Sequence, residues 1–120
     1  MIMTKELELE VSEILKDLGI SCDLTGYVYL QDAIKIVYES DKPEKLSVCK
    51  DIYSKIAEKH NSTESKVERA MRHSINIGVL YGNNNTYFEY FKYSMRYDKH
   101  TITNSQFIYT IAYKLKFKNN

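Results

Sequence analysis

The sequence predicts an all-α fold of about six helices in one domain that spans residues 1–120. Apolar residues recur at steps of three and four along most of the chain, which is the spacing of one helix face. The chain holds a single Pro and four Gly, so few residues break these patterns. With 120 residues, of which 43% are hydrophobic, the chain can bury one modest core.

Two amphipathic helices are expected in the N-terminal third. The first lies between Thr4, a residue type that caps helix N-termini, and Gly19, which suits the left-handed position after a helix. The second follows a turn at residues 24–26 and ends before Pro43, because Pro disfavours helix in the residue before it. The apolar stripes of the two helices are Leu7, Val11, Ile14, Leu15 and Leu18, and Leu30, Ala33, Ile34, Val37 and Tyr38.

The middle of the chain carries a short helical pattern, a polar turn and a longer helical pattern. The turn Asn61-Ser62-Thr63 can reverse the chain and cap the helix that follows, which we expect over residues 64–81. The short helix has apolar Ile52, Tyr53, Ile56 and Ala57, and the longer one has a stripe of small apolar positions, Val67, Ala70, Met71, Ser74 and Gly78. Two helices joined by a tight turn predict a helix-turn-helix at the centre of the fold.

The opposite face of helix 64–81 is basic and polar, and it predicts contact with double-stranded DNA. The residues of this face are Lys66, Arg69, Arg72, His73 and Asn76. Recognition helices contact bases with their N-terminal residues, where the sequence places Ser65, Lys66, Arg69 and Arg72. The charge is also uneven: residues 1–45 hold five Lys against ten acidic residues, whereas residues 46–120 hold twelve Lys or Arg against six. The alternative is a basic helix face that is merely solvated.

Each candidate residue has a chemical role. Arg69 and Arg72 can each form a bidentate pair with guanine O6 and N7, which contributes about 1–3 kcal/mol of discrimination. Glu68 can accept from cytosine or orient an Arg, although a solvent-facing acid explains it equally well. The remaining candidates bind phosphates or bases: Ser62 and Thr63 with nearby backbone amides, and Ser65 and His73 from the helix itself.

Two further helices are expected after the break at Gly82-Asn83-Asn84-Asn85. The aromatic stretch from Tyr87 to Tyr93 favours a short helix packed on the core through positions 87, 88, 91 and 90, with base stacking or a partner-binding surface as alternatives. The last helix begins with a capping box, Thr103 and Gln106, flanked by Ile102 and Phe107 at hydrophobic-staple positions. Its apolar stripe is Phe107, Ile108, Ile111, Ala112 and Leu115.

Other functional classes find little support in the sequence. Cys22 and Cys49 match no metal spacing, and His60, His73 and His100 are too scattered to form a metal or catalytic set. The residue types Arg69, Arg72, His73 and a late Tyr also occur in strand-cleaving recombinases, but the rest of such an enzyme is missing. No signal peptide, membrane span or cofactor motif is present, so we expect a cytoplasmic protein without a cofactor.

Six segments, in order over nearly the whole chain, carry a resemblance to a known family: 18–20, 26–34, 53–61, 65–75, 103–108 and 112–115. They resemble the C-terminal effector domains of sporulation-initiation response regulators, the stage-zero A transcription factors. The resemblance implies a DNA-binding regulator whose helix 64–81 reads the G residues of a TGTCGAA-type box. It also implies tandem dimers that form through the C-terminal helix, and contact with the RNA polymerase sigma factor.

The sequence departs from this family at three places. Lys66 stands where the family usually has Arg, and an ammonium lacks the fork geometry that pairs with guanine. Val79-Leu80-Tyr81 replaces a Trp-containing end, and residues 87–100 diverge, which weakens the expectation of sigma contact. No receiver domain precedes the effector region, so we expect a stand-alone relative or a trimmed chain. The runner-up function is a protein-interaction module or competitor that binds a partner through its aromatic 87–97 surface or its C-terminal helix.

Overall fold

The computed structural model describes residues 5–93 and 98–119 and confirms the all-α prediction. The described residues form six α-helices and no strand: α1 (Lys5–Asp17), α2 (Thr25–Glu39), α3 (Ser54–Lys59), α4 (Glu64–Tyr81), α5 (Asn84–Phe91) and α6 (Asn104–Lys118). Three shorter helical turns connect them: η1 (Pro43–Lys45), η2 (Val48–Tyr53) and η3 (Lys99–Thr101). η2 is a π-helical turn that runs directly into α3. The helical segment therefore extends beyond residues 52–57, where the apolar pattern predicted a short helix.

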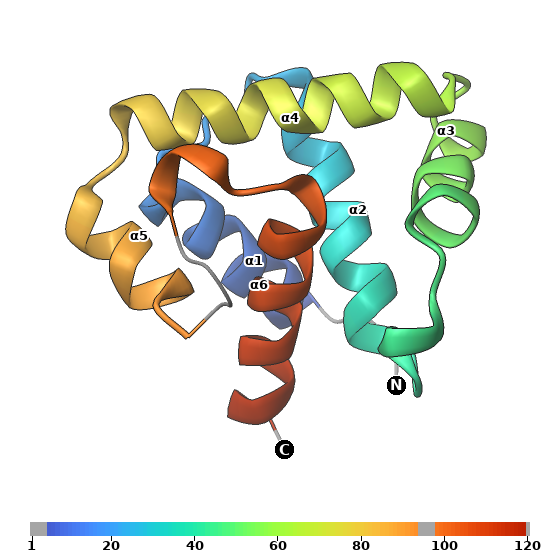
Figure 1. Cartoon of the computed structure of the whole chain (residues 1–120). Coiled ribbons are helices and arrows are strands. Elements are labelled where there is room, and N and C mark those ends of the chain that lie inside the picture. Colours follow the sequence, from blue (N-terminus) through green and yellow to red (C-terminus); the bar gives the residue numbers. More distant parts are fainter. Residues whose placement is uncertain (1–4, 94–97, 120) are drawn as a thin grey trace.

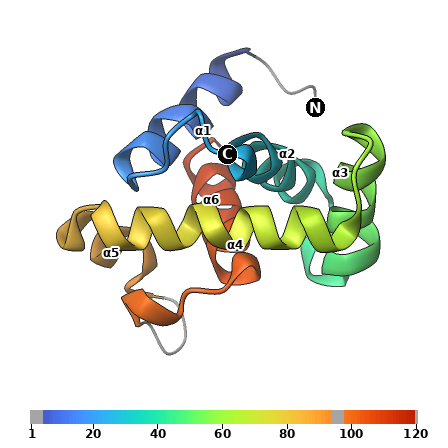
Figure 2. The ribbon, with the colours of Figure 1, turned by 90° about the horizontal axis from the view of Figure 1, so that it is seen from above.

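Helix α4 crosses the top of the molecule, with α2 and α6 beneath it (Figure 1). α3 lies at its N-terminal end and α5 at its C-terminal end. Seen from above, α1 and α2 lie on one side of α4, and the segment that leads into α6 lies on the other (Figure 2). The outer face of α4 is therefore uncovered by the other helices, whereas its inner face forms the roof of the core.

The predicted apolar stripes meet in one core. Among the residues with at most 2% of their surface exposed are Val11, Leu15, Leu30, Ile34, Met71, Ile75, Phe107 and Ile111, which come from α1, α2, α4 and α6. Burial of a side chain of this size stabilises the fold by about 1.5–3 kcal/mol, so these four helices hold one another in place. The C-terminal helix uses its whole predicted stripe in this core.

Two predicted helix ends are confirmed and two differ. Gly19 follows α1 with a left-handed φ of 78°. Thr103 caps α6, because its hydroxyl oxygen accepts a hydrogen bond from the backbone amide of Gln106 at 3.0 Å. Gly82 ends α4 as expected, but its φ of −77° is extended rather than left-handed. The turn expected at residues 24–26 is partly wrong, since Thr25 and Gly26 already belong to α2. The expected cap Thr4 lies outside the described residues.

Positions 26 and 82 require glycine because neighbouring atoms leave no room for a side chain, and not because of the backbone angles there. A Cβ on Gly26 would collide with the Ala70 carbonyl and the Ser74 hydroxyl of α4. A Cβ on Gly82 would lie 2.5 Å from the Gly78 carbonyl oxygen and 2.7 Å from the Tyr87 ring. Glycine therefore lets the start of α2 approach the middle of α4, which brings the two helices together near the candidate DNA-binding face.

Candidate nucleic-acid interface

The predicted helix-turn-helix consists of α3, a four-residue turn and α4. Asn61 takes a left-handed φ of 53°, and the Ser62 amide donates back to the Ala57 carbonyl at 2.8 Å, which closes the end of α3. Thr63 then caps α4, because its hydroxyl accepts from the Lys66 amide at 3.2 Å. The Thr63 side chain was expected to bind a phosphate. In the structure its oxygen accepts the hydrogen bond that caps α4.

The end of α3 is tied to α2 by one carboxylate. Asp32 on α2 accepts from the Lys59 ammonium at 2.9 Å and lies 2.6 Å from the His60 ring nitrogen Nε2. The Tyr29 ring meets the His60 ring edge-on, with 5.2 Å between their centroids. Because these contacts are made at the last residues of α3, they fix the position at which the turn delivers the chain into α4.

The predicted division of α4 into a buried and an exposed face is confirmed, except that Ala70 of the predicted apolar stripe is only half-buried. Val67, Met71, Ser74, Ile75 and Gly78 are buried. The predicted polar face is exposed: Ser65, Lys66, Arg69, Arg72, His73 and Asn76. The helix has 18 residues, which corresponds to about 27 Å, and all of these polar residues lie in its first 13 positions. The exposed face can thus approach another molecule without rearrangement of the core.

Glu68 lies at the edge of this face beside an Arg. Its carboxylate is 3.5 Å from the Arg72 guanidinium, and the two side chains are 37% and 57% exposed. An ion pair this exposed contributes little to stability. The contact places Glu68 beside an Arg, and the roles considered for Glu68 stay predictions. The guanidinium keeps most of its donors available to a ligand.

Two hollows follow the two flanks of α4. One, of about 420 Å³, separates the basic side chains Lys66, Arg69 and His73 from the first turn of α2, and is also lined by Ala70 and by residues 23–26. The other, of about 340 Å³, lies on the Arg72 side and faces the start of α6. Sequence reasoning missed the wall residues that come from α2 and from residues 101–105, because no local pattern signals that distant segments meet beside α4.

The aromatic stretch is divided between the core and the surface. Tyr87 and Phe91 are fully buried and stack with centroids 5.9 Å apart, as predicted for a core helix. Phe88 is 51% exposed, so its predicted place in the core is wrong, and Tyr93 is 87% exposed. The expected 87–97 surface is described only as far as residue 93, because residues 94–97 lie outside the described part.

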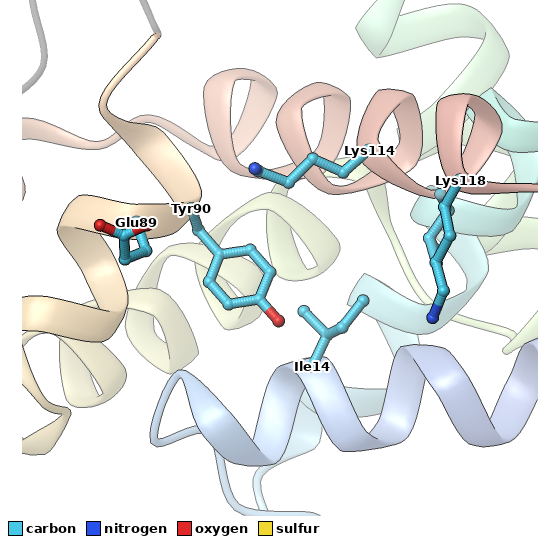
Figure 3. A pocket seen from close by; sticks show the side chains of 6 residues that line it. Ile14, Glu89, Tyr90, Lys114 and Lys118 are labelled. Carbon is cyan, nitrogen blue, oxygen red and sulfur yellow. The ribbon is translucent and has the colours of Figure 1, made fainter.

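A third hollow, of about 430 Å³, lies between α1, α5 and α6 (Figure 3). The Tyr90 hydroxyl points toward α1 near Ile14, and Lys114 lies over the Tyr90 ring, 5.6 Å from its centroid. Burial raises the pKa of the Tyr90 hydroxyl above its ordinary value of 10.0, so this group stays protonated near neutral pH. Lys118 at the rim is paired with Glu10 at 2.9 Å. We find no nucleophile and base in contact in this hollow.

The described residues offer no other chemical centre. Within residues 5–93 and 98–119, no three His, Cys, Asp or Glu side chains are grouped so that they could hold a metal ion. Cys22 and Cys49 are exposed and free. None of the helices in this part of the chain has the length and apolar character that crossing a membrane requires.

Comparison with known families agrees with this geometry. Residues 11–115 match the family described as "Sporulation initiation factor Spo0A C terminal". The match includes the helix-turn-helix, both flanks of α4 and the apolar stripe of α6. Members of this family are the DNA-binding domains of a transcription factor and not enzymes. The chain therefore belongs to the Spo0A C-terminal family, which confirms the resemblance found in its sequence.

Proposed function

We propose that this protein is a sequence-specific transcription regulator that reads the major groove of double-stranded DNA with α4. The observation that carries the proposal is the exposed polar face in the N-terminal part of that helix, where six polar or basic side chains lie together outside the core. A major groove admits one α-helix, and the residues near the start of a recognition helix contact the base edges. Membership of a DNA-binding family supports the same function.

Arg69 and Arg72 are the residues to which we assign base recognition. Both are exposed, and each can offer two parallel donors to one guanine. Ser65 and Lys66 lie one turn earlier, where they contact bases or the adjoining phosphates. His73 lines a hollow together with Lys66 and Arg69, and we assign it contact with a phosphate or a base there. Ser62 and Thr63 bind phosphate at the start of α4, with the backbone amides of its first turn.

Binding to a duplex with a TGTCGAA-type box and to a scrambled duplex tests this assignment. We expect the parent protein to prefer the box by well over tenfold, and Arg69→Ala or Arg72→Ala to abolish that preference. Arg69→Lys keeps the charge but loses the fork, so it should lose preference while the salt dependence of binding stays unchanged. Lys114→Ala, on the far side of the molecule, is the matched control. Equal binding to both duplexes by the parent would refute sequence-specific reading.

A second candidate function rests on exposed apolar side chains at the C-terminal end of α4, on α5 and just after α5. Leu80, Tyr81, Phe88 and Tyr93 are each more than half exposed. Large exposed aromatic residues favour contact with a protein partner. The sigma factor of RNA polymerase is such a partner, and a protein that occupies sites without this contact acts as a competitor. Binding to a partner protein should change little with salt, whereas binding to DNA should weaken steeply.

Dimer formation on tandem sites through α6 is part of the same proposal. The stripe of α6 from Phe107 to Leu115 is buried in the core of the monomer, so a dimer contact must use the remaining faces of the helix. Phe117, 81% exposed at its end, is the large apolar residue available there. Analytical ultracentrifugation of Phe117→Ser and the parent, with and without a tandem-site duplex, tests whether this end of α6 joins two copies.

A further inference from the structure

We propose that residues 101–105 form a second DNA-contacting edge beside the recognition helix, which holds a backbone phosphate in the hollow between this segment and α4. The inference rests on the proposed function, because it assumes that α4 enters a major groove. It assigns contacts to Thr101, Ser105 and Asn76, and it gives Arg72 a position from which it reaches both a base and a phosphate.

The lining of the hollow is suited to an anion with several oxygen atoms. It combines a guanidinium, an amide and three hydroxyl groups within about 340 Å³, from Arg72, Asn76, Thr101, Thr103 and Ser105. Thr103 accepts from the Gln106 backbone amide, so its own proton can still be donated to a phosphate. Thr101 donates to the Asp98 carbonyl over a long 3.3 Å, and a phosphate oxygen would replace that acceptor. The lining has a single carboxylate, Glu68, whose charge is countered by Arg72 at 3.5 Å. Arg, Asn, Ser and Thr side chains are among the groups that commonly contact DNA phosphates.

The segment is fixed to the recognition helix by one buried side chain. The Asn104 amide is 7% exposed and donates to the Tyr53 hydroxyl and to the Glu68 carbonyl, both at 3.1 Å. Tyr53 adjoins α3 and Glu68 belongs to α4, so this amide joins both helices of the helix-turn-helix to the start of α6. The backbone that carries the Thr103 and Ser105 hydroxyl groups therefore keeps a fixed position relative to α4 and Arg72. The hollow is thus formed before a ligand binds.

The position of the segment fits the shape of a duplex. The major groove is about 12 Å wide and is bounded by a phosphate backbone on each side, so a helix inside it has one backbone along each flank. One flank of α4 presents Lys66, Arg69 and His73. The other has only Arg72 as a basic side chain in its hollow, and residues 101–105 lie along it (Figure 2). Neutral donors on this second flank would hold the other backbone.

The test uses two variants that remove hydroxyl groups without changing charge, Thr101→Val and Ser105→Ala, alone and combined. We expect the double variant to bind the box duplex and the scrambled duplex about tenfold more weakly, by the same factor for each, since hydrogen bonds to a charged group are among the stronger ones. The slope of log affinity against log salt should not change, because no cation is lost. Thr86→Val on α5, outside both hollows, is the matched control, and thermal unfolding verifies that each variant is folded.

A duplex series with one methylphosphonate at a time, which removes the charge of a single phosphate, identifies the contact. At one position the substitution should weaken the parent protein by a larger factor than it weakens the double variant, which retains only the Arg72 and Asn76 contacts to that phosphate. Unchanged affinity of the double variant overturns the inference and leaves the recognition helix intact as a proposal. A loss confined to the box duplex also overturns it, since that result indicates contact with bases. Absence of DNA binding by the parent would refute the proposed function and this inference together.

Discussion

Replacement of Gly78 by Ala should destabilise the protein, although the same change stabilises an ordinary helix. In an isolated helix, Ala is favoured over Gly by about 1 kcal/mol. At this position a Cβ would lie 2.5 Å from the Tyr87 hydroxyl oxygen, 2.7 Å from the Leu18 carbonyl oxygen and 2.9 Å from Cγ1 of Ile20. Two of these three atoms are joined by a buried hydrogen bond, in which the Tyr87 hydroxyl donates to the Leu18 carbonyl at 2.6 Å.

The magnitude follows from the competition between these effects. Overpacking of a close contact costs about 1–3 kcal/mol, and a weakened buried hydrogen bond costs about 1 kcal/mol more. Together they exceed the gain in helix propensity, so we expect Gly78→Ala to lower the free energy of unfolding by about 1–3 kcal/mol. Urea unfolding followed by circular dichroism measures this as a lower midpoint at an unchanged slope.

A double-mutant cycle separates the two causes. Tyr87→Phe removes the hydroxyl oxygen that lies nearest to the new methyl group, but it leaves the contact with the Leu18 carbonyl. The combined variant should therefore lose less stability than the two single variants lose together. If Gly78→Ala is instead more stable than the parent by about 1 kcal/mol, the close packing of α4 against these residues is refuted.

Three further predictions concern the parts that hold α4 in place. Asp32→Ala should lower the free energy of unfolding in urea by about 1–2 kcal/mol, because it removes the acceptor shared by Lys59 and His60. Replacement of Lys35, a nearby lysine that does not make this contact, serves as the control. Gly19→Ala should lower the free energy of unfolding by about 1 kcal/mol, since a residue with a side chain is unfavourable at a φ of 78°. An unchanged free energy of unfolding would contradict the left-handed angle. Burial raises the pKa of the Tyr53 hydroxyl above 10.0, so the stability that depends on its proton is present below pH 10 and falls as the pH rises further. Tyr53→Phe should therefore lose less stability between pH 10 and 11 than the parent, and parallel losses would disprove this.

The central helix was predictable because its signals are local. The cap residue Thr63, the small apolar stripe and the break at Gly82 are all contained in twenty residues, and the observed bounds Glu64–Tyr81 match the predicted 64–81. The division into buried and exposed faces follows from the helical repeat alone. For the same reason, Gly19 and Thr103 were identified correctly as helix-end residues.

The errors arise at residues whose environment is determined by segments that are distant in the sequence. Gly26 looked like a turn residue, but it is glycine because the Ala70 carbonyl of α4 leaves no room for a side chain. Phe88 belongs to an aromatic run in which Tyr87 and Phe91 are buried, and only the packing of α5 shows that Phe88 faces outward. No spacing rule relates Asn104 to Tyr53 and Glu68, since the three belong to segments that are far apart in the sequence.

The same long-range contacts fix the orientation of α4, the helix that we propose reads DNA. Its buried face includes the small residues Ser74 and Gly78 beside larger side chains, and at these small residues the start of α2 and the residue pair Leu18 and Tyr87 approach its backbone closely. A helix held this near to the core cannot tilt without breaking those contacts, and its exposed face takes a fixed orientation. Variants of Gly26 and Gly78 should therefore alter DNA binding even though neither residue is exposed. Variants of Arg69 should alter DNA binding with little change in stability, because its side chain lies outside the core.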